Sequence, residues 1–262
     1  MPLLLDLFLS VKSRAERVPG AFRVYKLVTS RTGEGRVYTI RNGPLAGARW
    51  KRYNSLPFWY HRGVYEPPLS EFIARHLQPG DVFWDLGAHA GYHALVAARR
   101  VGPRGRVIAV EPEPGHCRIL REQMALNGID HCEVVEAAVA DREGVLTLLR
   151  QAADSRTSAL AGIARAGEPI SVRGLTLDHL AEAYPAPALV KIDIEGAETV
   201  ALPASRLFLS ERCRPRHVVI ATHGEEAMRV SRRFLEQHGY RVEPDRADPR
   251  TLVAEDVPAA VA

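Results

Sequence analysis

A glycine-containing segment with the sequence Asp-Leu-Gly-Ala-His-Ala-Gly covers residues 85–91, at the end of a short apolar run. In open α/β sheets, ligands bind beyond the carboxyl ends of the strands, where such runs stop. Gly87 lets the backbone turn tightly and approach a ligand, and Gly91 opens the following helix without a Cβ in the way. Asp85 suits a ligand with a positive ammonium group better than a diphosphate. Because the GxGxxG pattern of dinucleotide sites is absent, the segment disfavours an NAD-dependent oxidoreductase.

A second carboxylate, Glu111, ends the next apolar run, VIAVEP. A carboxylate in this position can accept hydrogen bonds from both hydroxyls of a ribose, in NAD enzymes and in methyltransferases alike. The order strand, DxGxxxG loop, helix, strand and glutamate is more selective, and it predicts a site for S-adenosylmethionine (SAM). The alternative is a Rossmann-like sheet in which the loop serves only for packing.

Three carboxylates, Asp193, Glu195 and Glu198, follow the apolar run ALVKI, and His223 follows a later run. Methyl transfer to an alcohol needs a general base or a metal ion that lowers the pKa of the hydroxyl. We therefore predict that Asp193 is catalytic, either as the base or as a ligand of Mg²⁺, because an oxygen-rich cluster without cysteine suits a hard cation. Glu195 and His223 are further catalytic candidates. For Glu198 the preferred interpretation is an interaction with the start of the next helix.

The composition is that of an ordinary globular protein. The chain has 262 residues, of which 46% are hydrophobic and 25% charged, and its formal net charge is +4. Disordered, collagen-like and coiled-coil proteins are thereby excluded. The basic residues are scattered along the chain, so no nucleic-acid partner is expected. Three cysteines without a CxxC pair argue against a disulfide framework or a thiolate zinc site and fit a cytoplasmic protein.

Apolar runs and helical periodicities alternate from about residue 70 onward, which predicts an α/β fold with an open, doubly wound and mostly parallel sheet. The expected strands are 81–86, 105–110, 132–136, 188–192, 217–221, 240–243 and 252–254, with short extra strands at 145–149 and 170–172. The expected helices are 69–77, 92–101, 114–126, 176–183 and 225–238. The strand that carries Asp193 should lie between the strands that carry Asp85 and His223.

We predict three parts along the chain: an N-terminal cap in residues 1–68, the catalytic domain in 69–256, and a frayed tail in 257–262. The cap should contain an amphipathic helix around residues 3–11 and a β-hairpin with strands at 36–40 and 48–53. The helix is too short to span a bilayer, and it could dock on its own domain, on the partner of a homodimer, or weakly on a membrane surface. The aromatic segment 54–68 and the polar loop 150–169 are expected to border the acceptor pocket, the loop as a flexible flap.

Several motifs resemble those of one known family. The segments DVFWDLGAHAGYHALVAARR, VIAVEPEP, LTLDHL and especially LVKIDIEGAE are similar to the FkbM family of SAM-dependent methyltransferases, over roughly residues 36–245. The resemblance implies the class I methyltransferase fold, which is Rossmann-like, and methyl transfer to oxygen on sugars or secondary metabolites.

The resemblance also implies roles for single residues. It places Asp85, Gly87, His89 and Gly91 in the SAM loop, Glu111 and Pro112 at the ribose, Ala138 and Val139 beside the adenine, and Glu66, with Tyr65, in a segment that closes over SAM. His89 stands where the family commonly has Asn, and Thr222 stands where an acidic residue is frequent. The expected function is therefore an O-methyltransferase acting on a small-molecule or glycan hydroxyl. The alternative is a binding or scaffold protein that kept the fold without turnover.

Overall fold

The computed structural model describes residues 33–56, 59–150, 158–161, 163 and 167–257. The helix expected at residues 3–11 and most of the expected tail lie outside these ranges. Within them, no helix combines the length and the apolar character that crossing a membrane requires.

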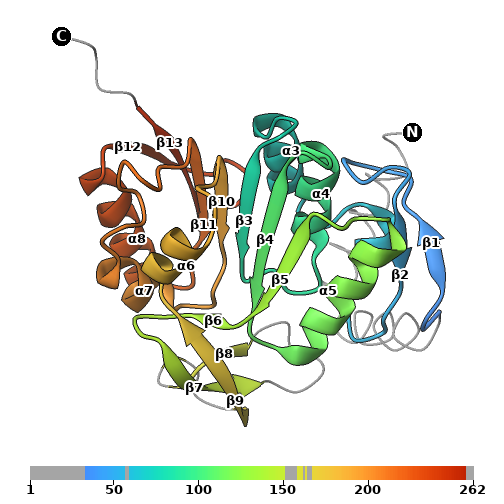
Figure 1. The fold of residues 1–262 in the computed structure, drawn as a ribbon, viewed down its shortest axis with the longest axis horizontal. Helices are drawn as coiled ribbons and strands as arrows, with labels where there is room; N and C mark the ends of the chain where they lie inside the picture. Colours follow the sequence, from blue (N-terminus) through green and yellow to red (C-terminus); the bar gives the residue numbers. More distant parts are fainter. Residues whose placement is uncertain (1–32, 57–58, 151–157, 162, 164–166, 258–262) are drawn as a thin grey trace, which may run out of the picture.

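A seven-stranded sheet forms the centre of the molecule, in the order β12-β13-β11-β10-β3-β4-β5 (Figure 1). Its strands are β3 (Val82–Leu86), β4 (Arg106–Glu111), β5 (Cys132–Glu136), β10 (Leu189–Ile192), β11 (His217–Ala221), β12 (Tyr240–Pro244) and β13 (Thr251–Asp256). The five strands from β11 to β5 pair in parallel, and β13 pairs antiparallel to both β11 and β12. The predicted mostly parallel, doubly wound sheet is confirmed, and β10 lies between β3 and β11 as expected.

Helices cover both faces of this sheet because its central strands are apolar on both sides. On β3, Phe83 packs with α3 (Pro67–His76), α4 (Tyr92–Val101) and α5 (Pro114–Leu126), whereas Trp84 packs with the helices of the opposite face. Those are α6 (Leu177–Ala183), α7 (Glu198–Ala204) and α8 (Glu225–Gln237). Thr176 caps α6 as predicted, because its side chain accepts a hydrogen bond from the backbone N–H of His179.

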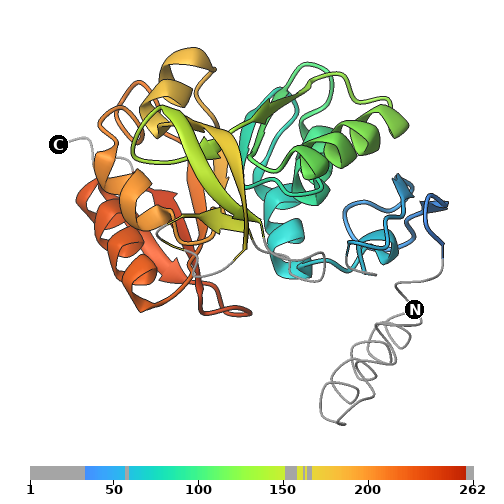
Figure 2. The ribbon, with the colours of Figure 1, turned by 90° about the horizontal axis from the view of Figure 1, so that it is seen from below.

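An N-terminal hairpin of β1 (Val37–Thr39) and β2 (Arg49–Lys51) lies beside α5, followed by the 3₁₀ turn η1 (Tyr60–Arg62) (Figure 2). Its apolar residues, among them Trp50 and Tyr60, belong to the same core as α3 and α4. Two side-chain amides, one on α5 and one at its C-cap, bind the outer side of β2. Gln123 bonds both backbone groups of Lys51, and Asn127 bonds both backbone groups of Arg49.

A smaller four-stranded sheet, in the order β6-β9-β7-β8, extends from the lower end of the main sheet in Figure 1. Its strands are β6 (Ala138–Val139), β7 (Gly144–Arg150), β8 (Ser158–Leu160) and β9 (Glu168–Leu175). The expectation that 150–169 is a loop is wrong for part of its described residues, because β8 pairs with β7; its expected role as a flexible flap stays a prediction. Leu148, Leu160 and Ile170 form a small apolar cluster there, and this packing holds the strand in place.

Candidate active site

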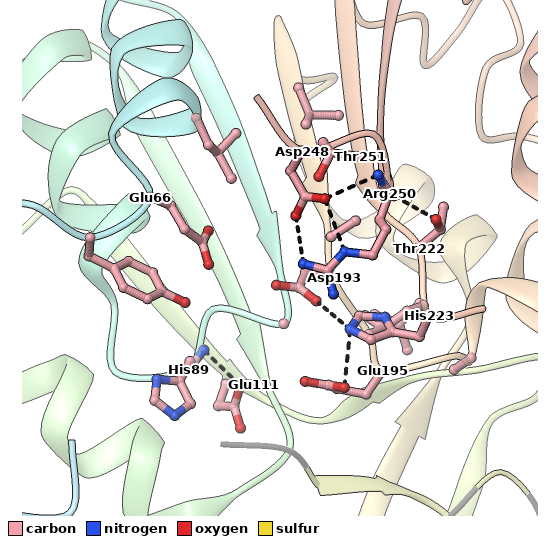
Figure 3. Close-up of a pocket in the computed structure, with 18 of the residues that line it drawn as sticks. Glu66, His89, Glu111, Asp193, Glu195, Thr222, His223, Asp248, Arg250 and Thr251 are labelled. Carbon is pink, nitrogen blue, oxygen red and sulfur yellow. Dashed lines mark hydrogen bonds and ion pairs between the residues drawn. The ribbon is translucent and has the colours of Figure 1, made fainter. Parts of the chain in front are cut away.

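A pocket of about 390 Å³ opens at the carboxyl ends of the parallel strands. One wall carries Glu66, His89 and Glu111, and the opposite wall carries the ends of β10 and β11 and the β12–β13 connection (Figure 3). The structure brings most of the predicted site residues together here: Glu66, Gly87, His89, Glu111, Pro112, Ala138, Val139, Asp193, Glu195 and His223. Asp85 and Gly91 do not line the pocket. Asp85 lies in β3, just before the loop that lines the pocket, and Gly91 is the N-cap residue of α4, just after it.

The glycine loop lies directly against the end of β10. Gly87 has φ +81°, and a Cβ built on it would lie 1.9 Å from the carbonyl oxygen of Asp193. The loop is held from the other side by β4, because the N–H groups of Gly87 and Ala88 both donate to the carbonyl of Val110. His89 also has a positive φ, of 50°, a conformation in which Asn is more common than His. The glycine loop and the strand end that carries Asp193 are therefore in backbone contact.

A buried lysine supports both of them. The Nζ of Lys191 lies 3.1 Å from Oδ1 of Asp85, 3.0 Å from the carbonyl of Gly87 and 3.7 Å from Oδ2 of Asp193. Burial alone would lower the pKa of Lys191, but the carboxylates of Asp85 and Asp193 outweigh burial and raise it. Lys191 is therefore an ammonium ion that neutralises Asp85, which is itself completely buried. The second carboxylate oxygen of Asp85 has no hydrogen-bond partner among the described residues.

At the other end of the pocket, Glu111 binds backbone groups on two sides. Its Oε2 accepts from the N–H of His89 at 2.8 Å, and its Oε1 accepts from the N–H of Glu113 at 3.1 Å. Nδ1 of His116, which the sequence analysis did not single out, lies 3.3 Å from the same Oε1. Burial lowers the pKa of His116, but Glu111 and Glu113 outweigh burial and raise it. A carboxylate offers about four acceptor positions, so Glu111 retains capacity for a ligand.

His223 and two carboxylates form a cluster at the ends of β10 and β11. Nε2 of His223 lies 3.2 Å from Oε2 of Glu195 and 3.6 Å from Oδ1 of Asp193 (Figure 3). All three side chains are partly exposed to the pocket. Burial raises the pKa of Glu195 to about 7. The carboxylates of Glu198, Glu195 and Asp193 raise the pKa of His223 to about 9.

Glu198 lies behind this cluster, and its side chain is completely buried. Its Oε1 accepts from the backbone N–H of Ile194 and lies 3.8 Å from Nδ1 of His223. Its Oε2 has no hydrogen-bond partner among the described residues. Glu198 is the first residue of α7, where the sequence predicted an interaction with the helix start, but its position beside His223 was not predicted. Its three-residue distance from Glu195 across Gly196 was the available signal.

The β12–β13 connection supplies the part of the pocket that the sequence analysis missed. Asp248 and Arg250 form an ion pair at 2.8 Å, and Thr222 hydrogen-bonds the backbone carbonyl of Arg250. The residues Asp245, Ala247, Thr251 and Val253 line the same wall. The sequence Asp248-Pro249-Arg250 marks a turn, but a turn signal does not show which way the connection folds.

The aromatic segment forms the rim on the side of α3. Tyr60, Tyr65, Leu69 and Phe72 line the pocket, and Tyr60 Oη lies 3.0 Å from Nδ1 of His89. Glu66 occupies the N-cap position of α3 without capping it, because its side chain makes no cap hydrogen bond. That carboxylate is instead part of the pocket wall.

A protein-family model matches more than half of the chain. The model of the "Methyltransferase FkbM domain" matches residues 85–242. This range includes the glycine loop, Glu111, Asp193 and His223.

Matches to curated proteins are shorter. The chain is 39% identical over 57 residues to an arsenite methyltransferase of Halobacterium salinarum, covering 22% of this chain and 15% of that protein. It is 32% identical over 82 residues to protein-L-isoaspartate O-methyltransferase 2 of Archaeoglobus fulgidus, covering 30% of this chain and 37% of that protein. The chain thus spans well under half the length of these relatives.

Solved structures match over more of the chain, at low identity. The methyltransferase FkbM of Methylobacillus flagellatus is 17% identical, with a TM-score of 0.46, and the match covers 71% of this chain and 50% of that chain. A fibrillarin of Aeropyrum pernix with bound SAM is 15% identical, with a TM-score of 0.42, and the match covers 69% of this chain and 67% of that chain.

Proposed function

Because the chain belongs to the FkbM family of SAM-dependent methyltransferases, we propose that it transfers the methyl group of SAM to a hydroxyl oxygen of a small molecule or glycan. The class I methyltransferase fold provides the frame. One observation carries the proposal: a single pocket joins the cofactor loop and Glu111 to the polar cluster at the ends of β10 and β11. A cofactor and an acceptor bound in that pocket would meet beside Asp193.

The residues on the side of β3 and β4 fit SAM. Glu111 accepts from three groups and has about one acceptor position left for a ribose hydroxyl, and Pro112, Ala138 and Val139 offer an apolar surface for the adenine. Gly87 lets the loop pack against the carbonyl oxygen of Asp193, which brings the SAM side of the pocket next to the end of β10. SAM, when bound, supplies an activated methyl group, so positioning accounts for much of the rate.

The chain's own residues must then remove the proton of the acceptor hydroxyl. We assign this role to Asp193, because it is the carboxylate in backbone contact with the cofactor loop. Its charge is held in place by Lys191 on one side and His223 on the other. A role of Asp193 as a ligand of Mg²⁺ would serve the same end by lowering the pKa of the hydroxyl.

The opposite half of the pocket suits an acceptor with several hydroxyl groups. Glu66, Asp248 and Arg250 place hydrogen-bonding groups of both signs around it, and Tyr65 and Phe72 add flat apolar faces. The polar groups can bond acceptor hydroxyls and fix the orientation of the acceptor, while the aromatic faces can cover its apolar side. An oxygen acceptor also agrees with the names of several relatives, among them a transmembrane O-methyltransferase of Homo sapiens that is 30% identical over 90 residues.

The test combines cofactor binding with turnover. Calorimetry should detect SAM binding and no NAD binding, and labelled SAM should methylate members of a panel of hydroxylated acceptors. Asp193→Asn should bind SAM normally and turn over about a hundred- to ten-thousand-fold more slowly. SAM binding without turnover on any acceptor would favour a scaffold protein, and normal turnover of Asp193→Asn would remove Asp193 from the mechanism.

A further inference from the structure

We propose that Asp193, Glu195 and His223 bind one divalent first-row transition-metal ion, of the kind represented by Mn²⁺ or Zn²⁺, at the acceptor side of the pocket. The three residues come from the ends of two neighbouring strands. The proposal rests on the proposed function only for the role of the ion, and binding itself requires neither SAM nor an acceptor.

The spacing of the ligand atoms fits a single ion. One potential ligand atom from each residue lies within 4.8 Å of the other two. Nε2 of His223 is 3.2 Å from Glu195 and 3.6 Å from Asp193. Two ligands that are each about 2.1 Å from one metal lie about 3.0 Å apart at a right angle and about 3.4 Å apart at the tetrahedral angle. The two edges of the cluster that meet at His223 therefore have nearly the length that two ligands of one ion require.

The ligand types select the class of ion. Imidazole nitrogen suits Zn²⁺, Fe²⁺ and other borderline ions, whereas Mg²⁺ takes oxygen ligands in nearly ideal octahedral geometry. A set of one imidazole and two carboxylates thus favours a transition metal over the Mg²⁺ expected from the sequence. Three protein ligands would leave further coordination positions for water or an acceptor hydroxyl, and all three residues line the pocket.

A buried carboxylate behind His223 gives independent support. Nδ1 of His223 faces Glu198, whose side chain is completely buried and whose Oε2 has no hydrogen-bond partner among the described residues. Metal-binding histidines characteristically turn their second nitrogen toward a carboxylate, which fixes the ring and its tautomer. The pair His223–Glu198 has this arrangement, with Nε2 directed to the cluster.

The charges around the cluster point the same way. Asp193, Glu195 and Glu198 bring three carboxylates to one histidine, and the lysine beside them, Lys191, lies 3.7 Å from Asp193 but also neutralises Asp85. A divalent cation would balance this excess of negative charge. An acceptor hydroxyl that coordinates the ion would have a lowered pKa and would lie next to Asp193.

The experiment is a metal titration of the full chain after removal of metals with a chelator. We expect Mn²⁺, followed by the paramagnetic resonance of the free ion, to bind at one site per chain. Zn²⁺ should displace it and Mg²⁺ at the same concentration should not. Glu195→Gln and His223→Gln should each weaken Mn²⁺ binding at least about tenfold, and Glu198→Gln about ten- to a hundred-fold through the orientation of His223.

The control variant is Asp248→Asn, which removes a carboxylate from the same pocket but outside the cluster. It should leave Mn²⁺ affinity unchanged, and thermal melts without metal should show that all variants fold. The site would be overturned if neither Mn²⁺ nor Zn²⁺ bound at millimolar concentration, or if Asp248→Asn lost as much Mn²⁺ affinity as the cluster variants. If Mg²⁺ bound as tightly as Mn²⁺, the proposed class of ion would be wrong. Because SAM binding and turnover are measured separately, a failure here leaves the proposed function standing.

Discussion

Glu111 is both a structural residue and a candidate cofactor ligand, and this double role determines what its replacement does. Its carboxylate accepts the backbone N–H groups of His89 and Glu113. Glu111→Ala should weaken SAM binding about ten- to a hundred-fold, since hydrogen bonds to a charged acceptor contribute roughly 1.5–3 kcal/mol. It should also speed hydrogen exchange of the His89 amide. Calorimetry and exchange mass spectrometry measure the two effects.

The matched control for this prediction is Glu136→Ala. Glu136 pairs in register with Glu111 on the neighbouring strand, but it is exposed and bonded to Arg121. SAM affinity should be the same as in the unchanged chain. If Glu111→Ala binds SAM as tightly as Glu136→Ala does, the ribose assignment is wrong.

His61 should make the fold sensitive to mild acid. It is buried in η1, and burial together with the positive charges of Arg52 and Arg62 lowers its pKa to about 4. The unfolded chain has a histidine pKa near 6.5, so it takes up a proton that the folded chain excludes. The contribution of neutral His61 to the free energy of unfolding is therefore fully present above about pH 6.5. It is lost as the pH drops toward 4, and the free energy of unfolding falls by on the order of 1–2 kcal/mol.

Melting temperatures between pH 7 and 5 test this contribution. His61→Phe keeps a ring beside Tyr38, 4.5 Å away between centroids in the native pair, and removes the titrating group. Its melting temperature should fall less over this pH range than that of the unchanged chain. Parallel curves for the two proteins would exclude His61 as a source of acid sensitivity.

Among the residues of the pocket, those at the ends of strands were predictable from the sequence. Those that reach the pocket from a connection or a helix start were not. Asp193 and His223 were predictable because parallel strands end at a common edge. Asp248, Arg250 and His116 were not, because no local signal states how a connection or a helix start is oriented. Glu198 was missed because its partner, His223, is on another strand.

At the scale of elements, the glycine loop and β10 must approach through their backbones. Gly87→Ala would place a Cβ against the carbonyl of Asp193 and would also require an unfavourable positive φ. Since neither backbone segment can give way cheaply, we expect a loss of at least about 4 kcal/mol of stability. Chemical denaturation measures it.

Gly128→Ala separates the two causes. Gly128 has a similar φ, of +67°, at the end of α5, but nothing lies within 4 Å of an added Cβ. Its replacement should cost only roughly 1–2 kcal/mol, the penalty of the backbone conformation. Similar losses for both variants would show that the loop and strand end are not tightly packed.

Most elements were predictable from local pattern. The helices 92–101 and 114–126 and the strands 132–136 and 217–221 have the expected bounds, because Gly91, Pro114 and short apolar runs mark them. The strands β7 and β9 are longer than expected, and β6 was not predicted as a strand. Their length depends on pairing with each other, with Gly144 opposite Gly174, and such long-range pairing leaves little trace in either segment alone.

At the scale of the whole molecule, the hairpin and the methyltransferase sheet should unfold together. Trp50 of the hairpin and Phe83 of the sheet belong to one core, and Gln123, which is completely buried, bonds both backbone groups of Lys51. We expect tryptophan fluorescence and far-ultraviolet circular dichroism to report coincident denaturation curves. Gln123→Ala should reduce stability by roughly 2–4 kcal/mol, because it leaves an N–H and a carbonyl without partners.

Gln237→Ala, a replacement of an exposed glutamine on α8, should change stability little and serves as the control. A separate early transition reported by the tryptophans would show that the hairpin is an independent unit. The domain boundary predicted near residue 68 stays a prediction until that measurement.

The side-chain amides of Gln123 and Asn127 also cover a strand edge that could otherwise pair with a second copy of the chain. The backbone groups of Arg49 and Lys51 that point away from β1 form a short strand edge, which in other proteins recruits a foreign strand. Gln123 and Asn127 occupy those groups with side-chain amides, so the edge is closed without a third strand. Replacing both residues would expose a template for intermolecular β pairing. The folded protein would then be prone to aggregate through this edge, in addition to being less stable.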